Sequence, residues 1–216
     1  MKDKNFVRVI DDVISTSYQK YIQNELIRES NWKFVKNVAN PYGESELKNG
    51  QYGLSKSIFD FELNTLDPSL YNLLIPSVFQ AIDKVYGYPV CDYHNVGFLR
   101  MRSFLHTPIQ NPEGKIINTA HIDDVKEHMV FLYYVNDSDG DTLLYDKFYP
   151  YDTDKVRPVE KNTTYQTLED NGINIDYRIT PKQGRMVIFN GKRYHSSTPP
   201  TNDVRCIINT NVVIGS

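Results

Sequence analysis

The C-terminal third of the chain contains the stretch that decides the fold, residues 184–213, GRMVIFNGKRYHSSTPPTNDVRCIINTNVV. A glycine turn leads into a hydrophobic strand over 185–189, and a second turn at Gly191 is followed by His195. Two prolines then separate this segment from a β-branched strand over 204–213, near the start of which lies Arg205. The pattern predicts β-strands that carry a histidine and an arginine ten residues apart.

Other strand patterns lie upstream, over residues 96–104, 128–135, 142–145 and 173–179, with Gly, Pro, Asn and Asp clusters between them. The first ninety residues differ. Apolar side chains at helical spacing predict a helix over 18–29, and Asp67 with Pro68 predicts the start of a second helix that ends near Gly87. Strands that follow two helices predict an α+β chain with a double-stranded β-helix, or jelly-roll, core. We expect one domain over 1–216, with a helical support region (1–90) and the core (91–216).

The composition, 216 residues with a formal net charge of −3, is that of a globular domain with a sizeable core. The mildly acidic balance argues against non-specific nucleic-acid binding, which needs a basic face. No run approaches the roughly 20 apolar residues that span a bilayer, and no apolar signal core is seen, so we expect a cytoplasmic protein without a membrane partner. The cysteines, Cys91 and Cys206, are expected to be reduced thiols.

One of the five histidines is followed two residues later by a carboxylate, in His121-Ile122-Asp123. Residues two apart on a strand point to the same side, so this pair can share one metal. His195 adds a second imidazole. Two histidines and one carboxylate on one face of a metal leave three positions open, as in non-haem Fe(II) oxygenases. Arg205 can pair in two-pronged fashion with the distal carboxylate of a 2-oxo acid bound there.

With these residues in view, the sequence resembles the Fe(II)/2-oxoglutarate-dependent dioxygenases, on the prolyl-4-hydroxylase-like branch. The resemblance rests on four segments in order: the HxD pair, the strand 131–136, the turn at 140–142 and the stretch 184–205. Two positions depart from the family pattern. The turn holds one glycine, Gly140, instead of two, and Ile207 stands where some members carry a polar residue.

The resemblance assigns roles to five residues of this chain. It implies that His121, Asp123 and His195 bind iron. It implies that Arg205 binds the distal carboxylate of 2-oxoglutarate, and that Tyr133 donates a hydrogen bond to the same carboxylate. Fe(II) is the implied metal, 2-oxoglutarate and O2 are the implied co-substrates, and ascorbate is a further candidate.

The implied activity is hydroxylation of a C–H bond in a peptidyl, prolyl-like substrate, with release of succinate and CO2. A free amino acid or other small metabolite is the alternative substrate, because the chain has no recognisable peptide-binding module. The expected partner is therefore a peptide, a protein or a small molecule, and the oligomeric state is left open. Long polar stretches over 37–52 and 147–171 are expected to carry substrate gating.

Two other classes of protein remain as alternatives. A non-catalytic jelly-roll binding protein would have no reason to keep three metal ligands together with Arg205. A zinc hydrolase could use two histidines and a carboxylate, but no glutamate base lies near either histidine. Arg100 and Arg102 alternate with apolar residues and should face one side of a sheet. A solvent-facing role is the preferred interpretation for both, although on an interior face one of them could bind an acidic substrate group.

Overall fold

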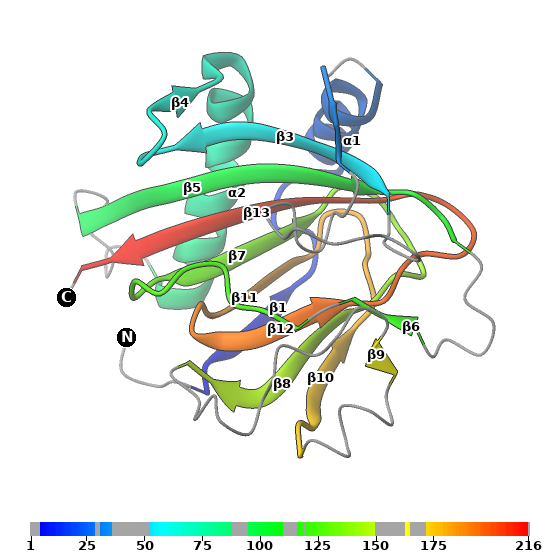
Figure 1. Ribbon diagram of the computed structural model, residues 1–216. Helices are drawn as coiled ribbons and strands as arrows, with labels where there is room; N and C mark the ends of the chain where they lie inside the picture. Colours follow the sequence, from blue (N-terminus) through cyan, green and yellow to red (C-terminus); the bar gives the residue numbers. More distant parts are fainter. Residues whose placement is uncertain are drawn as a thin grey trace.

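The computed structural model describes residues 5–28, 31–35, 52–87, 95–109, 116–118, 120–149, 163–164 and 172–215. Cys91, His94 and most of the two expected gating stretches lie outside these ranges. The elements shown in Figure 1 are, in chain order, β1 (Val7–Ile10), α1 (Thr16–Gln23), the π-helical turn η1 (Asn24–Arg28), β2 (Lys33–Val35), β3 (Gly53–Asp60), β4 (Thr65–Leu66), α2 (Pro68–Tyr86), β5 (Val96–His106), β6 (Ile116–Ile117), β7 (Met129–Tyr134), β8 (Thr142–Phe148), β9 (Thr163–Thr164), β10 (Ile175–Ile179), β11 (Met186–Asn190), β12 (Arg193–Ser197) and β13 (Arg205–Ile214).

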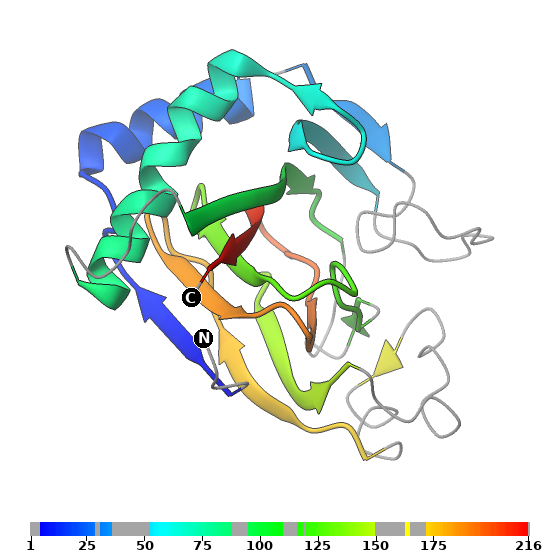
Figure 2. The ribbon, with the colours of Figure 1, turned by 90° about the vertical axis from the view of Figure 1, so that its left-hand side faces the viewer.

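Two antiparallel sheets form the core, and the helices cover the outer face of the larger one (Figures 1 and 2). The major sheet has the strand order β1-β11-β7-β13-β5-β3-β2, with β4 paired to β3, and the minor sheet has the order β10-β8-β12. Strands β6 and β9 form a separate pair. This arrangement confirms the predicted α+β jelly roll. The boundary expected at residue 90 does not divide it, because β1, β2 and β3 belong to the major sheet.

The second helix follows from its caps. The side chain of Asp67 accepts a hydrogen bond of 3.1 Å from the backbone N–H of Leu70, and Pro68 takes the first helical position. Gly87 ends the helix with a φ of 73°, a backbone conformation that favours glycine. The first helix begins at Thr16, two residues before the predicted start. No helix in the described ranges is long and apolar enough to cross a membrane.

Side chains alternate between two apolar layers along the central strands. On β7 and just beyond it, one set packs against the helices and the other packs between the sheets, as the two-residue period of a strand requires. The helix side holds Met129, Phe131, Tyr133 and Val135, and the inter-sheet side holds Val130, Leu132 and Tyr134. On β13, Cys206 and Ile208 face the helices and Ile207 faces the minor sheet. The interior between the sheets is therefore the side on which Arg205 also lies.

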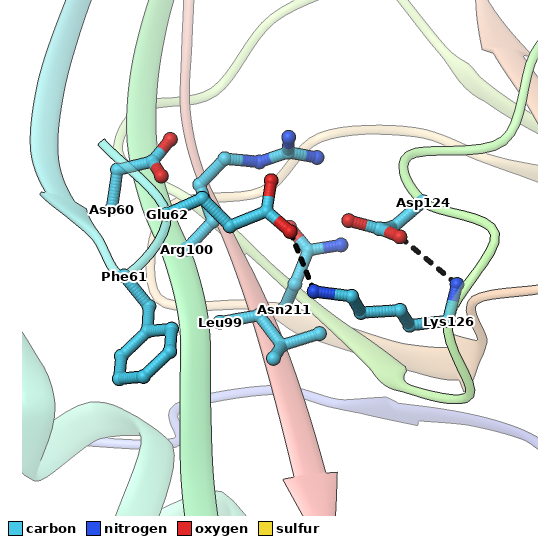
Figure 3. Close-up of a pocket in the computed structure, with 8 residues that line it drawn as sticks. All are labelled: Asp60, Phe61, Glu62, Leu99, Arg100, Asp124, Lys126 and Asn211. Atoms are coloured by element: carbon cyan, nitrogen blue, oxygen red, sulfur yellow. Dashed lines mark hydrogen bonds and ion pairs between the residues drawn. The ribbon is translucent and has the colours of Figure 1, made fainter. Parts of the chain in front are cut away.

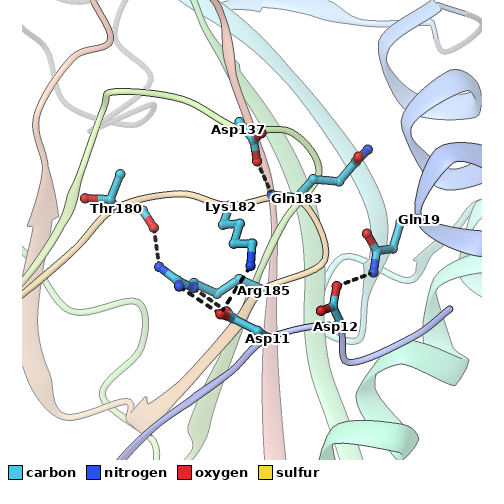
Figure 4. Close-up of polar contacts among 8 residues, drawn as sticks. All are labelled: Asp11, Asp12, Gln19, Asp137, Thr180, Lys182, Gln183 and Arg185. Atoms are coloured by element: carbon cyan, nitrogen blue, oxygen red, sulfur yellow. Dashed lines mark hydrogen bonds and ion pairs between the residues drawn. The ribbon is translucent and has the colours of Figure 1, made fainter. Parts of the chain in front are cut away.

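A polar cluster fixes the N-terminal segment to the turn that precedes β11 (Figure 4). Arg185 donates to both carboxylate oxygens of Asp11, at 2.6 and 3.0 Å. Gln19 donates to Asp12 at 3.1 Å and packs over Gly184. Gly184 has a φ of +78°, and a Cβ there would lie 2.3 Å from the Gln19 amide nitrogen. The glycine that opens the decisive stretch is thus favoured by its backbone conformation, and the Gln19 side chain fills the space that a Cβ would take.

Candidate metal centre

The two predicted histidine ligands are joined through their backbones. His121 lies in the segment between β6 and β7, and it forms an isolated antiparallel bridge with His195 on β12. The two residues exchange N–H to carbonyl hydrogen bonds of 3.0 and 2.9 Å. Residues that face each other across an antiparallel bridge project their side chains to the same side. The ring centroids consequently lie 4.6 Å apart.

Asp123 completes a cluster with these two histidines. One ligand atom from each of the three residues lies within 4.8 Å of the others. Oδ1 of Asp123 is 3.7 Å from Nε2 of His195 and 4.0 Å from Nε2 of His121. The side chains of Asp123 and His195 are nearly buried, whereas 39% of the His121 side chain is exposed. The structure therefore brings the predicted ligands together at a place that is open to solvent on one side.

Two asparagines on β13 orient the carboxylate of Asp123. Asn209 and Asn211 each donate a side-chain N–H to Oδ2, at 2.9 and 3.1 Å. Because both bonds end on Oδ2, Oδ1 is the oxygen that faces the histidines. Hydrogen-bond partners of this kind orient metal ligands and tune their affinity. Neither asparagine stands out in the sequence as a site residue.

The protonation pattern around the cluster suits a cation. Nδ1 of His195 donates to the carbonyl of Arg193 at 3.1 Å, which leaves Nε2 as the atom that faces Asp123. Burial alone would raise the pKa of Asp123, but the hydrogen bond and charge of His195 hold that pKa well below its usual range. Burial would lower the pKa of His195, but the contact with Asp123 raises it. Two imidazoles and one fixed carboxylate are a donor set that fits Fe(II).

The second predicted feature, Arg205, lies buried at the first position of β13 with only 2% of its surface exposed. Its Nη2 donates to Oγ1 of Thr142 at 2.7 Å, and Oγ1 also accepts from the hydroxyl of Tyr134 at 2.7 Å. Nη1 lies 3.5 Å from Nε2 of His106, and Nε is buried without a hydrogen-bond partner in the described part of the chain. Burial lowers the pKa of Arg205, but a guanidinium keeps its charge in proteins.

Gly140 makes room for this arginine. A Cβ at Gly140 would lie 3.0 Å from Cδ of Arg205 and 2.9 Å from both the carbonyl of Thr198 and the nitrogen of Pro200. Two of these three contacts are backbone atoms, which do not move aside as a flexible side chain does. The single glycine of the 140–142 turn is therefore at the position that the arginine needs.

The role expected for Tyr133 is corrected by the alternation on β7. Tyr133 packs in the layer between the major sheet and the helices, on the opposite face from Arg205. Tyr134 faces the interior, and the guanidinium carbon of Arg205 lies 5.8 Å from its ring centroid. Adjacent strand residues point to opposite faces, so only one of the two tyrosines can reach this place. Tyr134 takes the position that was expected for Tyr133.

Comparison with known proteins finds similar solved structures but no similar sequences. No family model matches the sequence, and no curated protein matches it either. Among solved structures, the chain is similar to the α-ketoglutarate-dependent non-haem epimerase SnoN of nogalamycin biosynthesis, with a TM-score of 0.61 and 9% identity over 98% of this chain and 79% of that one.

Two further structures are similar over nearly the whole chain. One is a prolyl hydroxylase from Trichoplax adhaerens in complex with a fragment of hypoxia inducible factor, with a TM-score of 0.56 and 14% identity over 97% of this chain and 84% of that one. The other is HygX from Streptomyces hygroscopicus with nickel and 2-oxoglutarate bound, with a TM-score of 0.57 and 12% identity over 98% and 84%. The chain therefore has the fold of the Fe(II)/2-oxoglutarate-dependent oxygenases.

Proposed function

We propose that the protein is an oxygenase that uses Fe(II), 2-oxoglutarate and O2 to hydroxylate a C–H bond of an organic substrate. In the balanced reaction, substrate, O2 and 2-oxoglutarate give hydroxylated substrate, succinate and CO2. His121, Asp123 and His195 would hold the iron, and Arg205 would hold the distal carboxylate of 2-oxoglutarate. When bound, the iron and the 2-oxo acid supply the oxidation chemistry.

One observation carries this proposal. Arg205 is a buried cation with no carboxylate partner among the described residues, and it lies on the same interior face as the asparagines that hold Asp123. A buried charge is costly unless an opposite charge and hydrogen bonds compensate it. An anionic ligand in the interior would supply that compensation. A molecule with a carboxylate at one end and a metal-chelating group at the other fits both sites at once.

The protein contributes binding and orientation at the carboxylate end. Thr142 accepts hydrogen bonds from both Arg205 and Tyr134, so its own O–H remains as a donor. Together with the unpartnered Nε–H of Arg205, this hydroxyl provides the charge-assisted contacts that a carboxylate needs. Ile207 lies on the same face of β13, between Arg205 and Asn209, and contributes an apolar wall.

The protein also shapes the metal end. Asn209 and Asn211 keep one oxygen of Asp123 aimed at the histidines. The ring of Phe189 lies 5.1 Å from that of His195 in an edge-on contact and so packs an apolar side chain against this ligand. The exposed side of His121 leaves an approach for the substrate.

This arrangement also separates the proposal from the two other classes of protein. A zinc hydrolase would account for the three ligands but not for a buried arginine whose Nε–H has no partner among the described residues. A binding protein without chemistry would not need the ligand cluster. The similar folds include a prolyl hydroxylase in complex with a peptide fragment and a carbocyclase of nogalamycin biosynthesis, so they do not choose between peptide and small-molecule substrates. The sequence leaves two candidate substrates, a peptidyl prolyl group and a free amino acid or other small metabolite.

The test is anaerobic addition of Fe(II) and 2-oxoglutarate to the purified protein. We expect the weak visible charge-transfer band of a chelated 2-oxo acid, and we expect Arg205→Gln to lose it at concentrations that saturate the wild type. Arg8→Gln is the matched control, because Arg8 is an exposed arginine that bonds the carbonyl of Val7. A wild-type protein without the band, or an Arg205→Gln variant that keeps it unchanged, would overturn the proposal.

A further inference from the structure

The interior face of the major sheet continues past β13 onto β5. In the β13–β5 register, Arg102 lies opposite Asn209 and Arg100 lies opposite Asn211. Paired residues share a face, so both arginines lie on the side of the sheet that carries Asp123. The solvent-facing role preferred from the sequence is therefore wrong for both. Only 13% of the Arg102 side chain is exposed, and Nη2 of Arg100 donates to the backbone carbonyl of Asp123 at 2.9 Å.

A pocket opens beside this contact (Figure 3). It lies between the end of β3, the start of β5, the segment after Asp123 and the end of β13. Its lining residues are Asp60, Phe61, Glu62, Leu99, Arg100, Asp124, Lys126 and Asn211. Asp124 directly follows the proposed metal ligand, and Asn211 bonds that ligand. The pocket therefore adjoins Asp123, although none of the three proposed ligands lines it.

The charges around the pocket differ in how they are paired. Asp60 accepts from Arg102 at 2.8 Å and from the backbone N–H of Leu63 at 3.1 Å. Glu62 and Lys126 form an exposed ion pair of 2.5 Å. These four side chains already have partners of opposite charge.

Arg100 and Asp124 are the two charges that stay available. Arg100 uses one N–H on a main-chain carbonyl, and no carboxylate within the described ranges bonds it directly, although its charge lies close enough to Asp60 to act on that carboxylate. A guanidinium has five N–H donors, so most of them remain for another acceptor. Asp124 accepts a backbone N–H from Lys126 at 2.9 Å through Oδ1. Both side chains are half-buried, and in Figure 3 both reach toward the same space.

We propose that the primary substrate is a free α-amino acid, bound through its carboxylate on Arg100 and its ammonium group near Asp124. This inference rests on the proposed oxygenase function. A cation and an anion that line the same pocket match a zwitterion, whereas an internal residue of a peptide has neither charge. A neutral substrate would cover both side chains without compensating them. With both α-substituents held at the pocket, the side chain of the amino acid is the part left for oxidation.

The test uses the wild-type protein with Fe(II) and 2-oxoglutarate and a panel of matched compounds. The panel holds the free L-amino acids, their carboxamides, their N-acetyl derivatives and proline-containing peptides with blocked ends. Perturbation of the charge-transfer band measures binding, and substrate-dependent succinate release measures turnover. We expect at least one free amino acid to act at concentrations roughly tenfold or more below those of its amide and its N-acetyl derivative.

Two variants locate the recognition. Arg100→Met should remove the preference for the free amino acid over its amide, and Asp124→Asn should remove the preference over the N-acetyl derivative. Each preference is a ratio within one variant, so it does not depend on how fully that variant is loaded with metal. Arg8→Met and Glu127→Gln are the controls, because both residues are exposed and lie outside the pocket.

Each outcome decides between the two proposals. Absence of the band in the wild-type protein overturns the oxygenase function itself. A band that no free amino acid perturbs, or that amides or blocked peptides perturb equally well, overturns the zwitterion proposal and leaves the oxygenase function standing. Preferences that survive both substitutions also overturn it.

Discussion

The side-chain amide of Asn209 donates a hydrogen bond of 2.9 Å to Oδ2 of Asp123, and this bond leaves Oδ1 facing His121 and His195. Asn211 adds a second bond to the same oxygen at 3.1 Å. Because both donors occupy Oδ2, the carboxylate is directed to bind a metal through Oδ1 alone. Binding through one oxygen leaves more positions open on the metal for other ligands.

We predict that Asn209→Ala combined with Asn211→Ala weakens Fe(II) or Mn(II) binding by roughly 10–100-fold, the usual effect of removing outer-shell partners. Anaerobic calorimetric titration measures this affinity directly. Asn202→Ala is the control, because the Asn202 amide bonds the exposed carboxylate of Asp139 in a similar way, at 2.9 Å. An affinity equal to that of the control would show that Asp123 needs no such orientation.

The neighbouring tyrosines provide a second test with its own control. Tyr134→Phe removes the hydroxyl that donates to Thr142, so we expect 2-oxoglutarate affinity to fall roughly 2–10-fold. Tyr133→Phe removes a hydroxyl on the other face of β7, which has no partner in the described residues, and should leave that affinity unchanged. Titration of the charge-transfer band compares the two. Equal effects, or the reverse order, would contradict the assignment of the interior face.

The part of the site that the sequence predicts is the part set by local patterns. The HxD spacing and the strand that leads to His195 are short-range features, and the structure brings their side chains together. The choice between Tyr133 and Tyr134 is not local. It depends on which face of β7 packs against the helices, and a shift of one residue reverses every side chain on a strand.

The asparagines and the interior arginines also depend on long-range pairing. Asn209 reaches Asp123 only because β13 lies beside the segment between β6 and β7. No local sequence pattern indicates that packing. One signal was present. In the strand 205–211, Arg205, Asn209 and Asn211 fall at odd positions, where Ile207 is the apolar exception, and Thr210 is the polar residue at an even position. That alternation marks a polar interior face on a strand that otherwise reads as β-branched core.

Gly140 provides a prediction about stability and binding together. We expect Gly140→Ala to lower the free energy of unfolding by about 1–3 kcal/mol, because its Cβ would meet two backbone atoms at 2.9 Å. It should also weaken 2-oxoglutarate binding, since the third contact is with Arg205. Gly97→Ala is the control, because its nearest neighbours lie at 3.9 Å. Urea unfolding followed by circular dichroism measures the stability, and a variant as stable as wild type would contradict the packing argument.

His106 gives the fold a dependence on pH that can be isolated. Burial, and then the charge of Arg205, hold the pKa of His106 well below its usual value of 6.5. Below that usual value the unfolded chain binds a proton that the folded protein does not bind. The folded state therefore loses stability as the pH falls from about 7 toward the lowered pKa, by at most about 1.4 kcal/mol per pH unit.

His106→Gln removes this titration. In metal-free protein, the stability of the wild type relative to the variant should be constant above pH 7.5 and should decline between pH 7 and 5. Urea unfolding at several pH values measures both proteins, and comparing the two cancels the carboxylates that they share. A difference that stays constant down to pH 5 would show that His106 does not remain neutral in the folded protein.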